Sequence, residues 1–247
     1  MFRRFPHIAA ASLAALALAL SACSGSTPTD QQPASQSSKA SETTQNSTDP
    51  TGQKESDPAQ NSTNPTEREP DPALDSKILT GEVAGVTLKK ADTLPDLDNA
   101  LQDTDAQIEP AGCLKTGITQ IGAGAQAITT AGVESLVLSS DSAAPGKYKE
   151  YAQRCSSVSG TVAGSPFKQN LEMQQTPDVG GVADLVAVMN SSDTTVKGKA
   201  VKANAYLLIG SVNGTTVVAQ STTFTGQAPS PETAAELFKA QVEKLKG

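Results

Sequence analysis

The sequence predicts an α+β domain, an antiparallel sheet packed by helices with one disulfide, preceded by a signal peptide and a disordered tether. Three observations carry this prediction. The composition changes sharply near residue 75, two alternating apolar runs flank Asn213-Gly214, and an amphipathic helix closes the chain. Asn-Gly between such runs is a strong hairpin signal, because both turn residues must adopt positive φ.

Residues 1–22 are expected to be a lipoprotein signal peptide. Arg3 and Arg4 precede an apolar run from Ile8 to Leu20, which is shorter than the ~20 residues that a membrane-spanning helix needs. The following Leu20-Ser21-Ala22-Cys23 resembles the bacterial lipobox. This resemblance implies that Cys23 is diacylated on sulfur and becomes the first mature residue, at the extracytoplasmic face of the cell membrane. The alternative is an ordinary secreted protein in which Cys23 merely lies near the cleavage site.

Residues 23–75 are expected to form a disordered tether. From Ser24 to Asp75 the chain has no Val, Ile, Met or aromatic residue, and Leu74 is its one large apolar side chain. Such a segment buries too little apolar surface to offset the entropy lost on ordering. The remaining residues, 76–247, are long enough for one domain with a sizeable core.

The charge argues against nucleic acid as a partner. The full chain has 19 Lys and Arg against 26 Asp and Glu, and removal of residues 1–22 makes the balance more acidic. Nucleic-acid binding depends on clustered Lys and Arg. The membrane is therefore expected as a partner through the lipid anchor and not through charge.

The three cysteines predict one disulfide. If Cys23 carries lipid, Cys113 and Cys155 remain as an even pair in an oxidising compartment. Cys155 falls on the apolar face of a helix predicted over 147–155, and Cys113 falls in a second helix predicted over 110–121. The alternative, a reactive thiol, is disfavoured because no histidine follows the leader and no Cys-x-x-Cys spacing occurs.

The other elements follow from periodicity. Alternation and β-branched content predict an extended first segment over 78–89 and strands over 133–139, 158–162, 169–174 and 183–189, before the hairpin of 201–212 and 215–225. Ser230 is expected to cap the last helix, with Pro231 in its first turn and lysines at its C-terminal end.

Catalytic and metal motifs are largely missing. The one histidine, His7, lies in the leader, so histidine-based nucleophilic systems, metal sites and cofactors are not expected. Ser165-Pro166-Phe167-Lys168 fits the S-x-x-K motif of penicillin-recognising enzymes, and Lys115-Thr116-Gly117 fits K-T-G. Their order is reversed relative to that family, so a hydrolase using Ser165 and Lys168 is only the alternative interpretation.

The domain resembles one family. Pro110 followed by Cys113, a second cysteine that ends a helix in Tyr-Ala-Gln-Arg-Cys155, a strand pair around a Gly turn and a C-terminal amphipathic helix carry the resemblance. This pattern is similar to the PknH-like extracellular sensor domains of actinobacteria, over residues 76–247. The resemblance implies a domain with a structural disulfide, a cleft and a sensing or binding role, and the missing catalytic motifs favour a domain without catalysis. Its ligand, whether a small envelope molecule, a lipid or a protein, and its ligand-binding residues stay unassigned.

Overall fold

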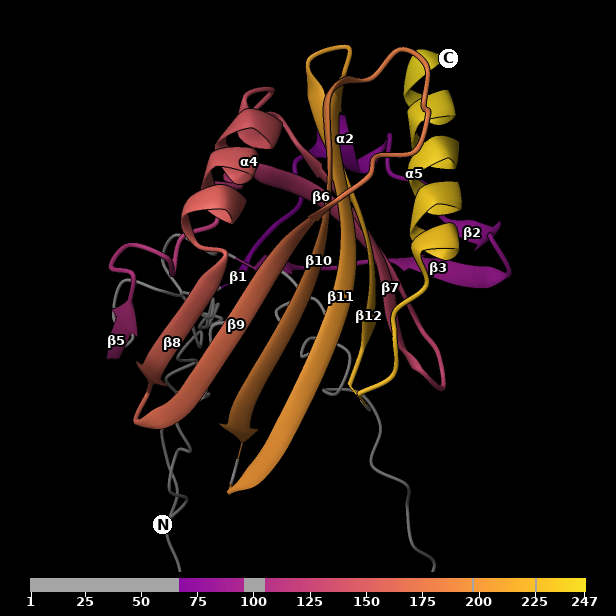
Figure 1. The fold of residues 1–247 in the computed structure, drawn as a ribbon. Coiled ribbons are helices and arrows are strands. Elements are labelled where there is room, and N and C mark those ends of the chain that lie inside the picture. Colours follow the sequence, from indigo (N-terminus) through magenta and orange to yellow (C-terminus); the bar gives the residue numbers. More distant parts are fainter. Residues whose placement is uncertain (1–66, 96–104, 197, 225) are drawn as a thin grey trace, which may run out of the picture.

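A computed structural model describes residues 67–95, 105–196, 198–224 and 226–247. Ten strands form one antiparallel sheet in the order β2-β3-β6-β7-β12-β11-β10-β9-β8-β5, and β1 and β4 form a separate two-stranded ladder. Two long helices, α4 and α5, pack on the twisted sheet (Figure 1). The predicted antiparallel sheet packed by helices is confirmed.

Strands make up about half of the described chain. They are β1 (Glu67–Arg68), β2 (Gly81–Val83), β3 (Val86–Lys90), β4 (Leu94–Pro95), β5 (Ala106–Glu109), β6 (Ile121–Ile128), β7 (Gly132–Ser139), β8 (Ser157–Val162), β9 (Ser165–Gln174), β10 (Ala183–Val196), β11 (Lys199–Val212) and β12 (Thr215–Thr223). The helices are α2 (Pro72–Asp75), α4 (Ala144–Arg154) and α5 (Pro231–Lys246).

The two long helices cover opposite faces of the sheet. Successive residues of a strand point to opposite faces, and the buried side chains divide accordingly into two clusters. On β11, Leu207 and Ile209 pack in the cluster of α4, whereas Tyr206 and Leu208 pack in the cluster of α5. We name these sides the α4 face and the α5 face.

The disulfide ties α4 to the segment before β6. Cys113 and Cys155 are bonded, with their Cα atoms 5.6 Å apart. Both cysteines are buried, and Tyr151 of α4 donates a hydrogen bond to the Cys113 carbonyl. The predicted pairing and the predicted helix around 147–155 are confirmed.

The C-terminal half follows its local sequence signals. Asn213 and Gly214 both have positive φ, at 49° and 78°, and join β11 to β12 as a tight hairpin. Ser230 caps α5 by accepting a hydrogen bond from the Thr233 N–H, and Pro231 occupies the first turn. These expectations are confirmed.

The helix predicted over 110–121 is wrong. Residues 111–114 form a turn, and residue 121 already begins β6. Gly112 and Gly117 have φ of +85° and +77°, a left-handed conformation that interrupts a helix. The apolar side chains that suggested the helix, such as Ile118, are nevertheless buried.

The N-terminal part also needs two corrections. Residues 67–75, assigned to the tether, belong to the folded domain, because they form β1 and α2 and bury Leu74. The segment 78–89 is not one extended element but the β2–β3 hairpin, which turns at Ala84-Gly85. The signal peptide and Cys23 lie outside the described residues. Within the described ranges, no helix has the length and apolar character needed to cross a membrane.

Candidate functional site

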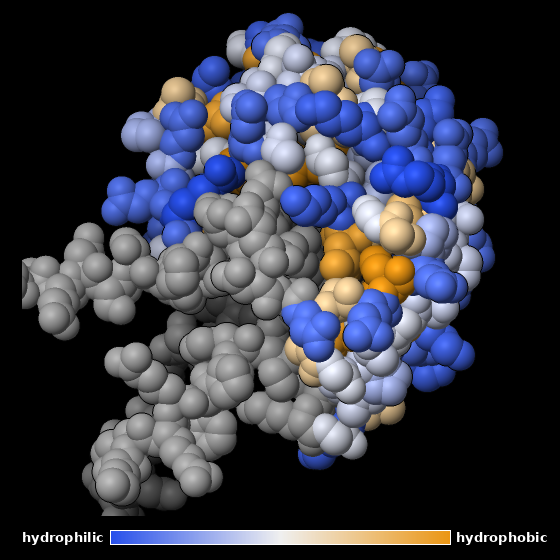
Figure 2. Space-filling model, turned by 90° about the vertical axis from the view of Figure 1, so that its left-hand side faces the viewer, coloured by the Kyte–Doolittle hydropathy of each residue, from blue (hydrophilic) through white to orange (hydrophobic). Residues whose placement is uncertain are grey.

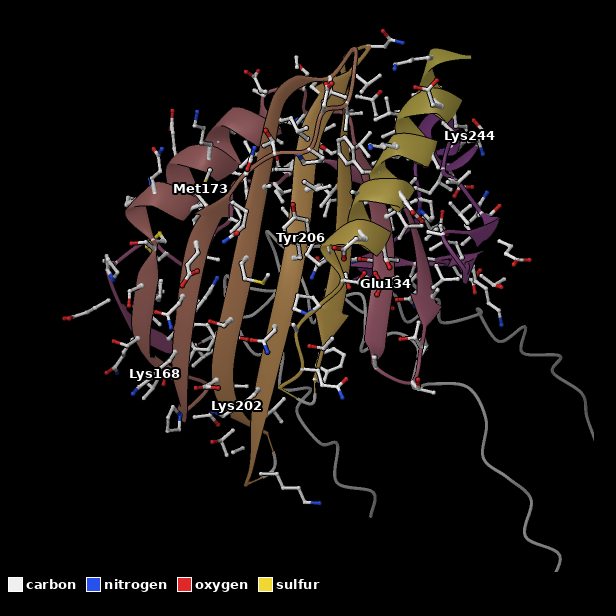
Figure 3. The ribbon with its side chains drawn as sticks, turned by 45° about the vertical axis from the view of Figure 1, so that its right-hand side comes forward. Glu134, Lys168, Met173, Lys202, Tyr206 and Lys244 are labelled. Carbon is white, nitrogen blue, oxygen red and sulfur yellow. A yellow bond between two sulfur atoms is a disulfide. The ribbon has the colours of Figure 1, made fainter. Side chains whose placement is uncertain are left out.

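The N-terminal segment is held by the last helix. The Gln241 side chain accepts a hydrogen bond from the Leu79 N–H and donates one to the Lys77 carbonyl. Lys244 donates to the Ile78 carbonyl, and Ile78 is buried in the α5-face cluster. Lys244 lies toward the C-terminal end of α5 (Figure 3). Helix α5 therefore fixes the chain immediately before β2.

The β2–β3 hairpin, which follows this attachment in the chain, lies close to the helix. Leu88 of β3 is buried in the same cluster as Leu237 and Val242 of α5, and β2 and β3 lie beside α5 at the right of the molecule (Figure 1). Strand β3 pairs with β6 only at Lys89–Gln126 and Lys90–Ala125. Toward its N-terminal end, β3 no longer pairs with β6 and remains paired with β2.

The two strands thus open into a wedge, and beyond Lys89–Gln126 no ladder between them pairs the main-chain groups on its two walls within the described residues. The Gly124 carbonyl accepts from the Ala91 N–H, which identifies the edge of β6 that faces β3. Main-chain groups alternate between the two edges of a strand, so Gln126 and Ile128 face the same way. By the same alternation Thr87 of β3 faces β6. In this register Thr87 and Ile128 would be the next hydrogen-bonded pair, but the ladder ends at Lys89–Gln126.

A cavity of about 850 Å³ occupies this wedge. Its walls are β3, the loop to β4, the end of β6, and Glu67 of β1. The volume falls in the ~300–1,000 Å³ range of small-ligand sites in proteins. Charged side chains of both signs line it, namely Lys89 and Lys90 against Glu67 and Asp92. Asp75 pairs with Lys90 at 2.9 Å, so the cavity does not present a strong charge of either sign.

Polar side chains extend from this cavity across the α4 face. Gln126, Ser135 and Gln220 face one another on β6, β7 and β12. Gln126 also lines the cavity, and its buried Oε1 atom has no hydrogen-bond partner. Thr194 Oγ1 and Asn190 Oδ1 on β10 are likewise buried and unpaired. Because buried polar atoms are normally paired, these three atoms are candidates for contact with a bound group.

A second polar cluster lies at the start of α5. Ser221 donates a hydrogen bond to Glu134 at 2.9 Å and accepts one from the Ser230 N–H. Burial raises the pKa of the Glu134 carboxyl, and the Ser221 bond partly offsets this effect. Tyr206 and Glu134 both lie near the first turn of α5 (Figure 3). The cluster connects β7, β12 and α5, so we assign it to the packing of this helix.

The residues of the hydrolase interpretation are not brought together. Ser165 pairs with Val162 and Lys168 with Ser159. They are three residues apart in one strand, β9, so their side chains point to opposite faces of the sheet. Lys115-Thr116-Gly117 lies in a loop and neither in a helix nor in a strand. Within the described part of the chain, no group of three or more His, Cys, Asp or Glu side chains could hold a metal ion.

The described surface on one side of the molecule is mainly hydrophilic (Figure 2). Figure 2 shows the side that carries β5, β8 and α4, where one small hydrophobic patch interrupts the hydrophilic surface. Among the described residues, the large hydrophobic side chains that are well exposed are Ile128, at 65%, and Met173, at 43%. Ile128 lines the wedge, so the more exposed of the two lies at the cavity.

The wedge residues Thr87, Gln126 and Ile128 were not predicted from the sequence. No motif marks them, because the cavity arises from the contact of two segments far apart in the chain. The expected anchor, Cys23, lies outside the described residues, and Cys113 and Cys155 form the disulfide described above.

Comparisons with known proteins leave the family open. No protein-family model and no curated protein matches the chain. A solved structure of an uncharacterized protein from Mycobacterium smegmatis, an ortholog of Rv0999, is 16% identical, with a TM-score of 0.37. The match covers 66% of this chain and 87% of the mycobacterial chain. This likeness to an actinobacterial protein is too distant to carry an argument about fold or function, and it shows no PknH-like domain.

Proposed function

We propose that this chain is a lipid-anchored lipoprotein of the cell envelope, with a folded domain that binds a ligand or partner outside the cytoplasm without catalytic turnover. The observation that carries the proposal is Leu20-Ser21-Ala22-Cys23, directly after a basic start and the apolar run from Ile8 to Leu20. The binding role is proposed from the resemblance to PknH-like sensor domains.

The disulfide supports the location. Cys113 and Cys155 are bonded to each other, and disulfides persist mainly outside the reducing cytosol. Of the three cysteines in the chain, this bond leaves Cys23 available for lipid. The cysteine count and the leader thus agree.

The cavity between β3 and β6 supports a binding role. It combines main-chain groups that the β3–β6 ladder leaves unpaired with polar and charged side chains, as a site that recognises a ligand by hydrogen bonds would. The hydrolase alternative rests on Ser165 and Lys168, which lie on opposite faces of β9 and cannot act on one substrate atom together.

Membrane fractionation tests the anchor. Cys23→Ala should move the protein from the membrane to the soluble fraction, and mass spectrometry of the wild-type N-terminus should show a diacylated cysteine. Ser24→Ala is the matched control and should stay in the membrane. A Cys23→Ala protein that remains with the membrane would refute the lipoprotein assignment.

Native mass spectrometry of the full chain in detergent tests the binding role. We expect a co-purifying molecule or protein that dissociates at higher collision energy, and no covalent adduct with a β-lactam probe. A β-lactam adduct that Ser165→Ala abolishes and Ser157→Ala retains would favour the hydrolase instead.

A further inference from the structure

We infer that the wedge between β3 and β6 binds a short extended peptide of a partner protein by β-strand addition. This inference rests on the proposed binding function and names its partner class. In this mode a peptide joins a strand edge, main-chain hydrogen bonds supply affinity, and alternate side chains supply specificity.

The main chain of both walls fits this occupant. Thr87 and Ile128 would form the next hydrogen-bonded pair of the β3–β6 ladder, but the strands separate after Lys89–Gln126. Each of these two residues presents one N–H donor and one carbonyl acceptor to the cavity. An extended peptide carries the same donors and acceptors at matching spacing along its edges, whereas few small molecules do.

The side chains that line the wedge indicate the composition of the peptide. Lys89, Glu67 and Asp92 line the cavity with both signs of charge, which suits a segment of low net charge. Ile128 is 65% exposed on the wall of the wedge. A β-branched or aromatic residue opposite Ile128 would form the type of cross-strand pair that stabilises antiparallel ladders.

Defined contacts hold the strands on one side of the wedge, so the wedge is not a frayed sheet edge. Gln241 and Lys244 of α5 hold residues 77–79, and Leu88 is buried in the hydrophobic cluster to which this helix contributes. The β2–β3 hairpin therefore cannot close onto β6 without losing these contacts. The site is preorganised, which lowers the entropic cost of binding.

The test is a selection of peptides on the full-length chain in detergent. A displayed library of random nonapeptides is selected against the wild type and counter-selected against Ile128→Pro, which lacks the N–H donor of the wall. Ile128→Val keeps that donor and is the control. Selected peptides should bind Ile128→Pro about tenfold more weakly, the effect of one or two lost hydrogen bonds, and Ile128→Val almost unchanged.

N-methylated peptides provide a second readout on the unaltered protein. In strand addition only alternate N–H groups of a peptide face a given wall. Each wall offers one carbonyl that the ladder leaves free, so methylation of a single position should weaken binding by about tenfold where that N–H faces the Thr87 or the Ile128 carbonyl, and by about twofold or less at the other positions. Equal effects at every position, or no selected peptide that distinguishes wild type from Ile128→Pro, would overturn the inference.

Hydrogen exchange distinguishes the partner from the chain itself. The Ile128 amide should exchange quickly in the peptide-free protein and become protected when a selected peptide binds. Protection without any peptide would mean that the chain fills its own wedge, and the inference would be wrong. If native mass spectrometry finds a ligand that leaves Ile128 unaffected, the wedge inference fails and the proposed binding function stands.

Discussion

Helices α4 and α5 cover opposite faces of one sheet, but different bonds hold them. A covalent bond from Cys155 to Cys113 and the Tyr151 hydrogen bond fix α4 to the segment before β6. Helix α5 has no such bond and holds the N-terminal segment through Gln241 and Lys244. The α4 side is thus closed by a cross-link, whereas the α5 side is closed by hydrogen bonds to the segment before β2.

Among the changes that test this difference, removal of the disulfide should lower the free energy of unfolding most. The bond closes a loop with a sequence separation of 42 residues, and its loss should lower the free energy of unfolding by about 4 kcal/mol. The Cys113→Ala/Cys155→Ala variant should unfold at lower urea concentration than the wild type. Reductant should destabilise the wild type and leave the variant unchanged. Equal stability of the two proteins in oxidising buffer would contradict a structural role for the bond.

Loss of the Gln241 side-chain amide should have the next largest effect, confined to the α5 side. Gln241→Leu leaves the Leu79 N–H and the Lys77 carbonyl without partners, which should lower stability by about 2–3 kcal/mol. Hydrogen exchange should accelerate in β2 and β3 before it changes around α4. Lys239→Ala, at an exposed position of the same helix, is the control. Uniform acceleration across the sheet would show that α5 does not hold the hairpin specifically.

Loss of a helix cap should lower the free energy of unfolding by less than either of these changes. Ser230 accepts a hydrogen bond from the Thr233 N–H, whereas the residue before α4, Ala143, has no side chain that can do so. Ser230→Ala should therefore lower the free energy of unfolding by about 1 kcal/mol. Ser230→Thr keeps the acceptor and should lie close to the wild type in the same urea titration. A Thr variant as unstable as the Ala variant would point to packing in place of capping.

The smallest effect concerns pH. Burial raises the pKa of Glu134 above 4.5. The folded state therefore binds this proton more tightly than the unfolded chain, and stability is lost as pH rises through the folded pKa. Glu134→Gln should remove that loss in urea titrations between about pH 4 and pH 8. A steeper loss in the variant would contradict the assignment.

Asp141, near the start of α4, should respond in the opposite direction. The hydrogen bond from Lys147 lowers its pKa, with smaller effects from Thr119 and the Ala143 N–H. Its contribution to stability is present above its unfolded pKa and is lost as pH falls through the folded pKa. Below about pH 4, Asp141→Asn should therefore lose less stability than the wild type. Glu134→Gln should match the wild type there, because Glu134 acts at higher pH.

The elements predicted from sequence are those fixed by local rules. Asn213-Gly214 and the cap at Ser230 each depend on a few neighbouring residues, and both are found as expected. The helix expected over 110–121 failed because glycines 112 and 117 take left-handed φ. Apolar spacing alone did not reveal that.

The candidate site was not predictable for a different reason. Nothing local distinguishes Thr87 or Ile128 from other strand residues. Their environment depends on Gln241, whose bonds to Lys77 and Leu79 join positions separated by 164 and 162 residues. The Ala84-Gly85 turn adds to the difficulty, because Ala84 has a φ of 52°, which alanine rarely adopts.

The short β1–β4 ladder has a mechanical consequence. Glu67 and Arg68 pair with Pro95 and Leu94, and the Arg68 guanidinium donates to the Ile121 carbonyl. A pulling force applied through the chain before Glu67 reaches these bonds first. These few bonds would break before the force reaches the long ladder between β10 and β11.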